Sequence, residues 1–250
     1  LGLGLYTFGA LFALRGWRRS RDAARMQADF TAAISHEMKT PIASVRAMAE
    51  MLQDGDPELA ERYAPRIEGE MRRLGATVRN VLDAAQIERG ALAVALRPAD
   101  PAAAMTAALE GLQPELARRG FEVSVAIQPA AALQPLDPDA LGGVLVNLVD
   151  NAAKFSPPEG TIVVEGEPVS DGYHIAVLDR GPGLGSGNPE RLFERFYRGE
   201  AARKGAVPGV GLGLHIARQV IAAHGGTLRA RDREGGGAAF EIDLPSGTPS

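Results

Sequence analysis

His36 is the residue of this sequence with the clearest capacity for chemistry, because it lies on the outer side of a predicted amphipathic helix. The apolar residues around it recur at three- and four-residue steps, as in a helix packed into a bundle or coiled coil: Phe30, Ile34, Met38, Ile42, Val45, Met48 or Ala49, and Leu52. His36 is about 200° around the helix axis from Ile34. Its imidazole is therefore expected to face a partner that arrives from outside.

Three neighbours complete this candidate site. Glu37 places a carboxylate beside the imidazole, and Thr40, four residues beyond His36, shares its exposed helix face. Pro41 lacks an N–H group and is expected to bend the helix just after the histidine. Taken alone, this segment also fits an ordinary solvated surface histidine.

A second polar stripe lies on the predicted helix that ends near Phe155. Asn147, Asp150, Asn151 and Lys154 follow at i, i+3, i+4 and i+7, opposite an apolar face. Amide oxygens are hard ligands suited to Mg²⁺, and a lysine can neutralise phosphate oxygens. The stripe predicts a metal–phosphate site, with a merely solvated helix face as the alternative.

Asp179, Gly181 and Gly183 come directly after a predicted strand. A carboxylate at that position can accept a hydrogen bond from an exocyclic amino group, and the glycines let the backbone approach a flat base. The combination predicts a pocket for a nucleotide base. By itself it is equally compatible with an ordinary glycine turn.

Gly209, Gly211 and Gly213 precede a predicted helix that starts at Leu214. Glycine-rich backbone at a helix N-terminus offers free N–H groups and a positive dipole end to phosphate groups. We therefore expect the phosphate side of a nucleotide site here, although a single glycine pattern of this kind is weak.

A long connection separates these two glycine clusters. It contains residues 192–198, in which Phe193 and Phe196 are expected to anchor its base, followed by the weakly hydrophobic residues 199–208. A loop of this length inside a compact domain is usually functional, and we expect a lid over the ligand. The alternative for its base is a short packed helix.

The histidine is predicted to lie on a helical hairpin. A first helix is expected from about Arg21 to Leu52, a turn at residues 54–57, and a second amphipathic helix from about Leu59 to Ala85, in which Pro65 implies a bend or a late start. One hairpin has too little core to be stable alone. Two hairpins from two chains would form a four-helix bundle, so a homodimer is expected.

Beyond a linker predicted at residues 97–101, the hydrophobic period changes from helical to alternating. Strands are expected at residues 121–127, 161–165, 174–179, 227–231 and 239–244, with helices near 102–118, 138–154 and 212–224. This order predicts an α+β two-layer sandwich, a sheet covered on one face by helices.

The N-terminal segment differs from the rest. Residues 1–14 carry no charge, and five arginines between Arg15 and Arg25 follow with only Asp22 against them. We expect the end of a truncated transmembrane helix, with residues 15–250 on the cytoplasmic side and Trp17 at the interface. A signal peptide would carry its basic residues first, whereas a buried soluble helix remains an alternative.

Composition excludes several other classes of protein. The net charge is −4 and there are no cysteines, so nucleic acid binding is not expected and thiolate chemistry is excluded. The four histidines lack zinc-ligand spacing.

The order of these segments resembles bacterial two-component sensor histidine kinases from residue 22 to residue 245. Residues 34–41 resemble the H box, 147–156 the N box, 179–184 the first glycine box, 192–198 the F box and 209–214 the second glycine box. The resemblance implies a multidomain protein: a transmembrane end at 1–14, a basic juxtamembrane segment at 15–28, a dimerisation and phosphotransfer domain at 29–92, and a catalytic domain of the histidine kinase/gyrase/Hsp90 type at 99–246.

The resemblance also implies roles. His36 would accept the γ-phosphate of ATP with help from Glu37, and Thr40 would orient a water for the reverse reaction. Asn151, with Asn147, would bind Mg²⁺, while Lys154 would neutralise charge. The remaining ATP-binding residues would be Asp179, Gly181 and Gly183 around adenine, and Phe193, Phe196, Arg198, Gly209, Gly211, Gly213 and Leu214 along the lid and phosphates.

The partner implied by this family is the receiver domain of a response regulator, and the location implied is the bacterial inner membrane. Two rival interpretations remain at this stage. One is an ATPase of the same fold without histidine chemistry, which the dimerising hairpin disfavours. The other is a non-catalytic or phosphatase-biased scaffold that binds a regulator, which the presence of His36, Glu37, Asn151 and Asp179 disfavours.

Overall fold

A computed structural model describes residues 32, 34–53, 56–199, 202, 207 and 209–247 of the chain. The chain forms two compact units, residues 1–78 and residues 79–250. Several predicted features lie outside the described residues. They are the membrane segment, the basic segment, Phe30, the start of the hairpin turn and most of the lid at 199–208. Within the described ranges, no helix is both long enough and apolar enough to span a membrane.

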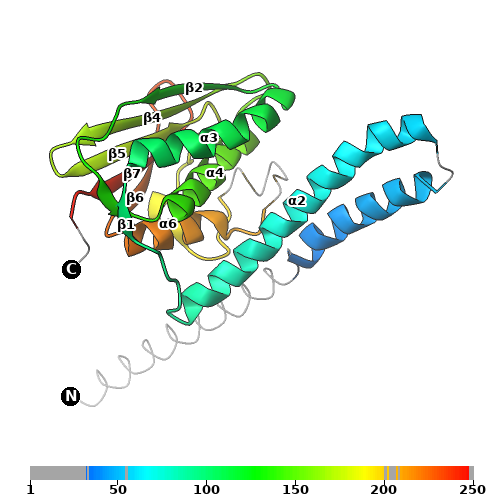
Figure 1. Cartoon of the computed structure of the whole chain (residues 1–250), viewed down its shortest axis with the longest axis horizontal. Coiled ribbons are helices and arrows are strands. Elements are labelled where there is room, and N and C mark those ends of the chain that lie inside the picture. The colour runs from blue at the N-terminus through cyan, green and yellow to red at the C-terminus, as the bar shows by residue number, and fades with distance from the viewer. Residues whose placement is uncertain are drawn as a thin grey trace, which may run out of the picture. The chain divides into compact units, whose positions relative to one another are not determined.

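The first unit contains most of the predicted helical hairpin. Residues 34–51 are helical without interruption at Pro41, whose side chain is buried. α2 (Pro57–Glu88) runs back from the turn, as the blue and cyan ribbons of Figure 1 show. Pro65 lies inside α2, so this helix does not start late. Its last ten residues, from Arg79 to Glu88, belong to the second unit.

Part of the predicted apolar stripe on the hairpin remains exposed to solvent. Met48 is 8% exposed, whereas four large apolar side chains of the predicted stripes are not covered: Ile42 at 53%, Met71 at 51%, Val78 at 39% and Leu82 at 56%. The hairpin thus covers only part of its own apolar surface, as expected for half of a larger bundle.

The second unit is built on a five-stranded sheet of order β2-β4-β5-β7-β6. Only β2 and β4 are parallel, and the other neighbours are antiparallel. The strands are β2 (Glu122–Ile127), β4 (Thr161–Val169), β5 (Gly172–Leu178), β6 (Thr227–Asp232) and β7 (Ala238–Pro245). Each of the five strands predicted from alternation is therefore present, with ends shifted by a few residues.

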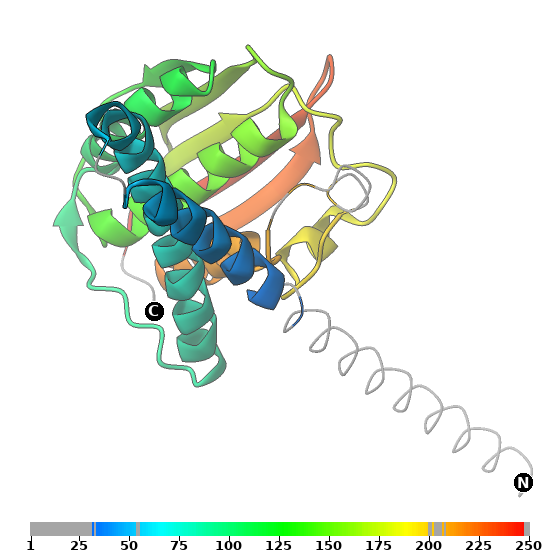
Figure 2. The same ribbon diagram turned by 90° about the vertical axis from the view of Figure 1, so that its right-hand side faces the viewer.

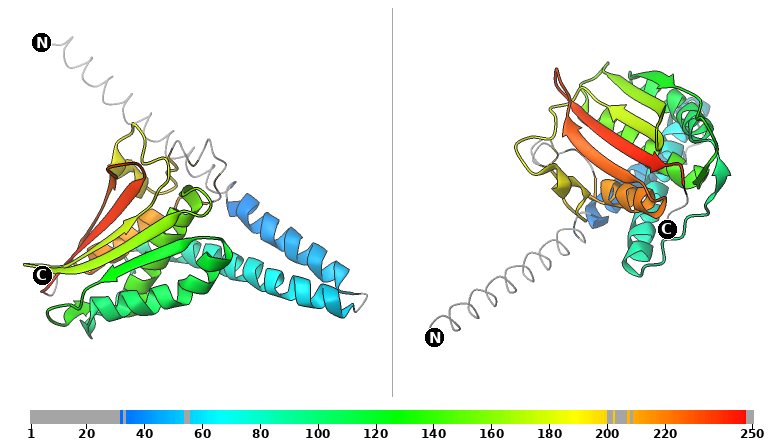
Figure 3. Two further views of the ribbon diagram at one scale, coloured as in Figure 1. Left: turned by 90° about the horizontal axis from the view of Figure 1, so that it is seen from above. Right: turned by 90° about the vertical axis from the view of Figure 1, so that its left-hand side faces the viewer.

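Three helices cover one face of this sheet: α3 (Pro101–Arg118), α4 (Pro138–Phe155) and α6 (Gly213–Ala223). They lie in front of the sheet in Figure 2 and behind it in the opposite view at the right of Figure 3. The predicted α+β two-layer sandwich is confirmed.

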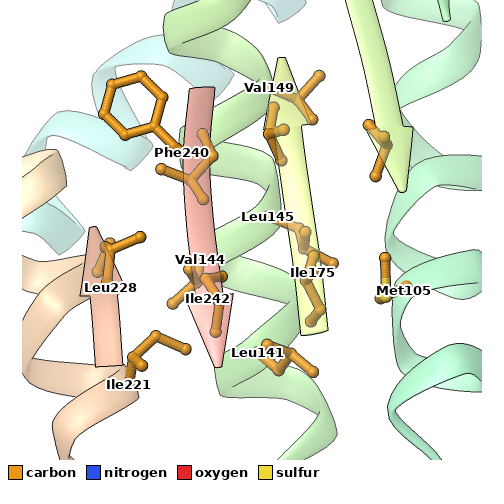
Figure 4. Close-up of a cluster of buried hydrophobic side chains, with 14 of the residues drawn as sticks. Met105, Leu141, Val144, Leu145, Val149, Ile175, Ile221, Leu228, Phe240 and Ile242 are labelled. Atoms are coloured by element: carbon orange, nitrogen blue, oxygen red, sulfur yellow. The ribbon is translucent and has the colours of Figure 1, made fainter. Parts of the chain in front are cut away.

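The core of the sandwich lies between these two layers (Figure 4). Alternate residues of β5 and β7, such as Ile175 and Ile242, point toward the helices and are 0% exposed. Leu141 and Leu145 of α4 and Met105 of α3 meet them and are equally buried. Burying each such side chain contributes about 1.5–3 kcal/mol of transfer free energy, and the same packing fixes the polar face of α4 on the opposite side.

Two short strands were not predicted. β1 (Arg97–Ala99) pairs antiparallel with β3 (Gln134–Leu136), so the segment expected to be a linker is part of the second unit. Strands of three residues are too short to show alternation, and Pro98 and Pro135 argued against pairing. The prediction of a linker at residues 97–101 was wrong for Arg97–Ala99.

Asp137 is the N-cap residue of α4. Its Oδ1 accepts hydrogen bonds from the backbone N–H groups of Asp139 and Ala140, both at 3.1 Å, and its Oδ2 accepts one from Ala95 at 2.8 Å. Its own N–H donates to Nε2 of the buried His224 at 3.0 Å. Burial alone would raise the pKa of Asp137, but these backbone donors and His224 hold that pKa below its ordinary value.

We expect Asp137→Ala to lower the free energy of unfolding of the second unit by about 2 kcal/mol, because three backbone donors lose their acceptor. Urea denaturation at pH 7 would measure this loss. Since the pKa of Asp137 is lowered on folding, its contribution is complete above the ordinary pKa of about 3.9 and is lost as the pH falls through the lower folded value. The difference between wild type and Asp137→Asn should therefore shrink in acid. A difference that grew below pH 4 would contradict this assignment.

Candidate functional site

The candidate phosphoacceptor lies in the first unit. His36 and Thr40 are exposed and Glu37 is half-buried, as expected from their helix positions. The Thr40 hydroxyl donates to the backbone carbonyl of His36 at 3.1 Å. Within the described part of the chain, the His36 ring makes no hydrogen bond. The imidazole is therefore available to an incoming reactant.

The other predicted site residues lie in the second unit, and the polar stripe of α4 is their centre. Asp150 accepts from Arg119 at 3.2 Å with one carboxylate oxygen and pairs with Lys154 at 2.7 Å with the other. These three side chains are about one-third exposed, so the pairs contribute little to stability and mainly orient the Lys154 ammonium. Asn151 is half-buried on the same face.

α4 contacts both predicted glycine clusters. A β-carbon on Gly213 would lie 2.2 Å from Oδ1 of Asn147, and one on Gly181 would lie 2.8 Å from the carbonyl oxygen of Phe155. The Ser156 hydroxyl accepts from the backbone N–H of Arg180 at 3.3 Å. The residues predicted to bind metal, base and phosphate are thus brought together around one helix.

Asp179 is held firmly at the end of β5. It is 4% exposed, and its Oδ1 accepts from the backbone N–H groups of Gly181 at 2.8 Å and Ala238 at 2.9 Å. Oδ2 has no hydrogen-bond partner among the described residues. One oxygen is therefore fixed by the backbone, and the other remains as an acceptor for a ligand.

The hairpin between β6 and β7 also contacts the segment that starts at Asp179, and the sequence did not lead us to predict this contact. Arg233 donates to the backbone carbonyl of Asp179 at 3.3 Å, and Asp232 accepts from the N–H of Leu184 at 2.7 Å. A β-carbon on Gly237 would lie 2.1 Å from that same carbonyl oxygen of Asp179. The run Gly235–Gly237 was the available signal, because three consecutive glycines permit such a close approach.

The base of the predicted lid is tied to α6. A short 3₁₀ helix, η1 (Pro189–Phe193), ends at the buried Phe193, and its carbonyl oxygen is 3.1 Å from Nδ1 of His215. Burial lowers the pKa of His215, so the ring is neutral near pH 7 and Nδ1–H donates. Arg218 lies over the Phe193 ring at 5.0 Å and pairs with Glu190 at 2.6 Å. The short packed helix, which was the alternative for this segment, is present, and the role of Phe193 as an anchor for a lid stays a prediction.

After the base of the predicted lid, the backbone at Phe196 packs closely against the backbone of the second glycine cluster. Phe196 has a left-handed backbone with φ 63°, and its N–H donates to Gly211, φ 71°, at 2.8 Å. Arg198 donates to the carbonyl oxygens of Ala202 at 3.0 Å and of Val207. Gly209 and Leu214 are half-buried beside this crossing. Arg198 is thus engaged with the backbone of the lid segment itself.

Fold and site together define a class of protein. A helical hairpin with an exposed histidine precedes an α+β sandwich in which a carboxylate, an amide-rich helix and two glycine loops converge, and this is a phosphoacceptor domain joined to an ATP-binding domain.

Comparison with known proteins assigns the family. The model described as "His Kinase A (phospho-acceptor) domain" matches residues 26–90, and the one described as "Histidine kinase-, DNA gyrase B-, and HSP90-like ATPase" matches residues 136–248. Sensor protein SphS of Synechococcus elongatus is 35% identical over 234 residues, which cover 90% of this chain and 56% of SphS. The chain thus spans about half the length of this curated relative.

Two solved structures are similar in fold. A mycobacterial sensor histidine kinase, MprB, is 33% identical with a TM-score of 0.51, over 62% of this chain and 99% of that one. Histidine kinase ThkA, solved in complex with the response regulator protein TrrA, has a TM-score of 0.59 at 21% identity, over 92% of this chain and 64% of that one. The chain belongs to the two-component sensor histidine kinases.

Proposed function

We propose that this protein is an ATP-dependent protein-histidine kinase that phosphorylates His36 and passes the phosphoryl group to an aspartate of a response regulator. The observation that carries the proposal is the presence on one chain of an exposed histidine in a phosphoacceptor domain and an ATP-binding domain with its acceptor, Asp179 Oδ2, free. A regulator-binding scaffold would require neither feature.

The residues present fit ATP. The free oxygen of Asp179 can accept from the adenine amino group, while Gly181 and Gly183 allow the backbone to approach the ring. The N-terminus of α6, preceded by Gly209 and Gly211, offers N–H groups to phosphates. Phe193, Phe196 and Arg198 would hold the base of the lid, and Lys154 on the polar face of α4 would neutralise phosphate charge.

The donor set also fits Mg²⁺. Amide oxygens on the polar face of α4 are hard ligands, and Asn151 is the residue that we assign to the metal. When bound, Mg²⁺ would neutralise charge on the phosphate oxygens.

The chemistry at the phosphoacceptor follows from its exposure. A ring nitrogen of His36 attacks the γ-phosphorus, the N–P bond forms, and the bond to the β,γ-bridging oxygen breaks to release ADP. Glu37 orients the imidazole and accepts its proton. The labile N–P bond favours transfer to a regulator carboxylate over storage. Thr40 can orient a water for dephosphorylation of the regulator, which we propose as a second activity.

Labelling tests the proposed kinase activity. The chain is incubated with γ-³²P-ATP, with and without Mg²⁺, and the linkage is then treated with acid and with alkali. We expect Mg²⁺-dependent label that is acid-labile and alkali-stable. ATP binding without label would favour the scaffold, and acid-stable label would exclude a phosphohistidine.

The exposed stripe on the hairpin supports a homodimer. Ile42 and Met71 are each more than half exposed, and a second hairpin would cover them in a four-helix bundle. We expect the double substitution Ile42→Glu and Met71→Glu to convert dimers to monomers in analytical ultracentrifugation. Ala76→Glu, on the far side of α2 from Val78, should leave the dimer intact. A dimer that survives both sets would place the interface elsewhere.

Attachment to the membrane is proposed from the sequence alone. Residues 1–14 would form the end of a transmembrane helix, with residues 15–250 on the cytoplasmic side of a bacterial inner membrane. The N-terminal helix would then carry signals down to His36.

A further inference from the structure

Asp232, the last residue of β6, is bonded to a loop that lies far away in the sequence. Its Oδ1 accepts a hydrogen bond from the backbone N–H of Leu184 at 2.7 Å, although the two residues are 48 positions apart. A hydrogen bond from an N–H group to a carboxylate is stronger than one between neutral groups. Asp232 therefore anchors the end of the 179–184 loop, whose glycines are assigned to the nucleotide base.

The same oxygen leaves the loop no room to move toward β6. A β-carbon on Gly183 would lie 2.5 Å from Oδ1 of Asp232 and 3.4 Å from the carbonyl oxygen of Gly237. Gly183 also has φ 77°, a conformation that glycine adopts readily and other residues do not. The backbone of the loop thus lies directly against the hairpin formed by β6 and β7.

The other end of the loop is held by the same hairpin. The backbone N–H of Asp179 donates to the carbonyl oxygen of Ala238 at 2.9 Å, and its Oδ1 accepts from the N–H of Ala238 at 2.9 Å. Arg233 donates to the carbonyl oxygen of Asp179 at 3.3 Å. Both ends of the 179–184 loop are therefore attached to residues 232–238.

The turn of this hairpin fixes the spacing of these attachments. Asp232 and Ala238 are opposite each other in the pairing of β6 with β7. The N–H of Arg233 donates to the carbonyl oxygen of Gly237 at 2.8 Å, and the N–H of Gly236 donates to that of Arg233 at 3.1 Å. These hydrogen bonds close the turn, so the two anchoring points of the loop are held at one separation.

We propose that Asp232 is a positioning residue for the nucleotide base. It acts through Leu184, whose anchored N–H keeps the 179–184 loop in place. Gly181 and Gly183 can then face the base, and the free oxygen of Asp179 can accept from it. This inference rests on the proposed binding of ATP, and it assigns a role in that binding to an exposed residue outside the five segments of the sequence resemblance.

Autophosphorylation kinetics and ADP calorimetry on the 250-residue chain test the proposal. Asp232→Ala should raise the KM for ATP and weaken ADP binding by the same factor, about tenfold, because the loop loses an anchor. The kcat at saturating ATP should stay within about twofold of wild type, since this loop does not hold the transferred phosphoryl group. Asp232→Asn keeps an oxygen acceptor and should restore ADP affinity to within about twofold of wild type.

Glu234→Ala is the matched control, because it removes a carboxylate from the same hairpin. Glu234 is exposed and makes no hydrogen bond or ion pair within the described part of the chain, so ADP affinity and KM should not change. Asp232→Leu provides a second variant without an acceptor in case the alanine variant does not fold.

Three results would overturn the positioning role while leaving ATP binding by the wild type intact. They are unchanged ADP affinity in Asp232→Ala, equal losses in Asp232→Ala and Asp232→Asn, and a lower kcat at unchanged KM. Failure of the wild-type chain to bind ADP would instead refute the proposed function itself.

Discussion

His36→Gln is expected to abolish phosphoryl incorporation, with a loss of at least ~1,000-fold, and to leave ADP affinity within about twofold of wild type. The reason is that phosphoryl acceptance and nucleotide binding are assigned to different units of the chain. In the proposed reaction His36 supplies the attacking nitrogen from the first unit, whereas the residues assigned to nucleotide binding lie in the second. Glutamine keeps helix propensity and polarity but has no nucleophilic nitrogen. Autoradiography and ADP calorimetry on the same preparations would measure both quantities.

A second accessible histidine provides the control for this experiment. His174 on β5 is half-buried, and its Nδ1 lies 2.7 Å from a carboxylate oxygen of Asp243. An imidazole oriented by a carboxylate is a reasonable acceptor in chemical terms, so His174→Gln must retain full labelling if His36 is the acceptor. If the label persisted in His36→Gln and disappeared in His174→Gln, the phosphoacceptor would be His174 on the sheet.

The parts of the fold that periodicity predicts are those in which one face is buried. β7 alternates from Phe240 onward because the helices cover only one side of the sheet, and α4 separates into apolar and polar faces for the same reason. β1 and β3 carry no such pattern, since three residues give too few alternations. Their pairing depends on contacts distant in sequence, such as that between Ala95 and Asp137.

The sequence predicts which residues belong to the candidate site, but it does not predict the hydrogen bonds and contacts that these residues make. Spacing places Asn147 and Asn151 on one helix face, yet only the crossing of α4 with α6 distinguishes their surroundings. The sequence likewise singles out Asp179, but not the two backbone donors that occupy one of its oxygens. The second of these, Ala238, is 59 residues away, and no local signal relates two positions so far apart.

Asp179→Asn is expected to weaken ATP binding by ~100-fold, about 2.7 kcal/mol, with little loss of fold stability. The amide can keep its oxygen on the N–H groups of Gly181 and Ala238, which preserves the pocket. Its nitrogen then replaces Oδ2, so that a donor faces the donor amino group of adenine. Asp179→Ala should differ, because both backbone donors lose their acceptor and the unfolding temperature falls as well. Calorimetry with ATP and thermal unfolding would separate the two effects.

The same substitution should reverse the base preference. Inosine triphosphate carries an oxygen acceptor where ATP carries the amino group, so the asparagine nitrogen of Asp179→Asn can donate to it, whereas the carboxylate of the wild type repels it. We expect wild type to prefer ATP and the variant to prefer the inosine nucleotide. The reversal requires Oδ2 itself to contact position 6 of the base, because a general loosening of the pocket would weaken both nucleotides alike. Equal losses for the two would therefore place adenine recognition on another group.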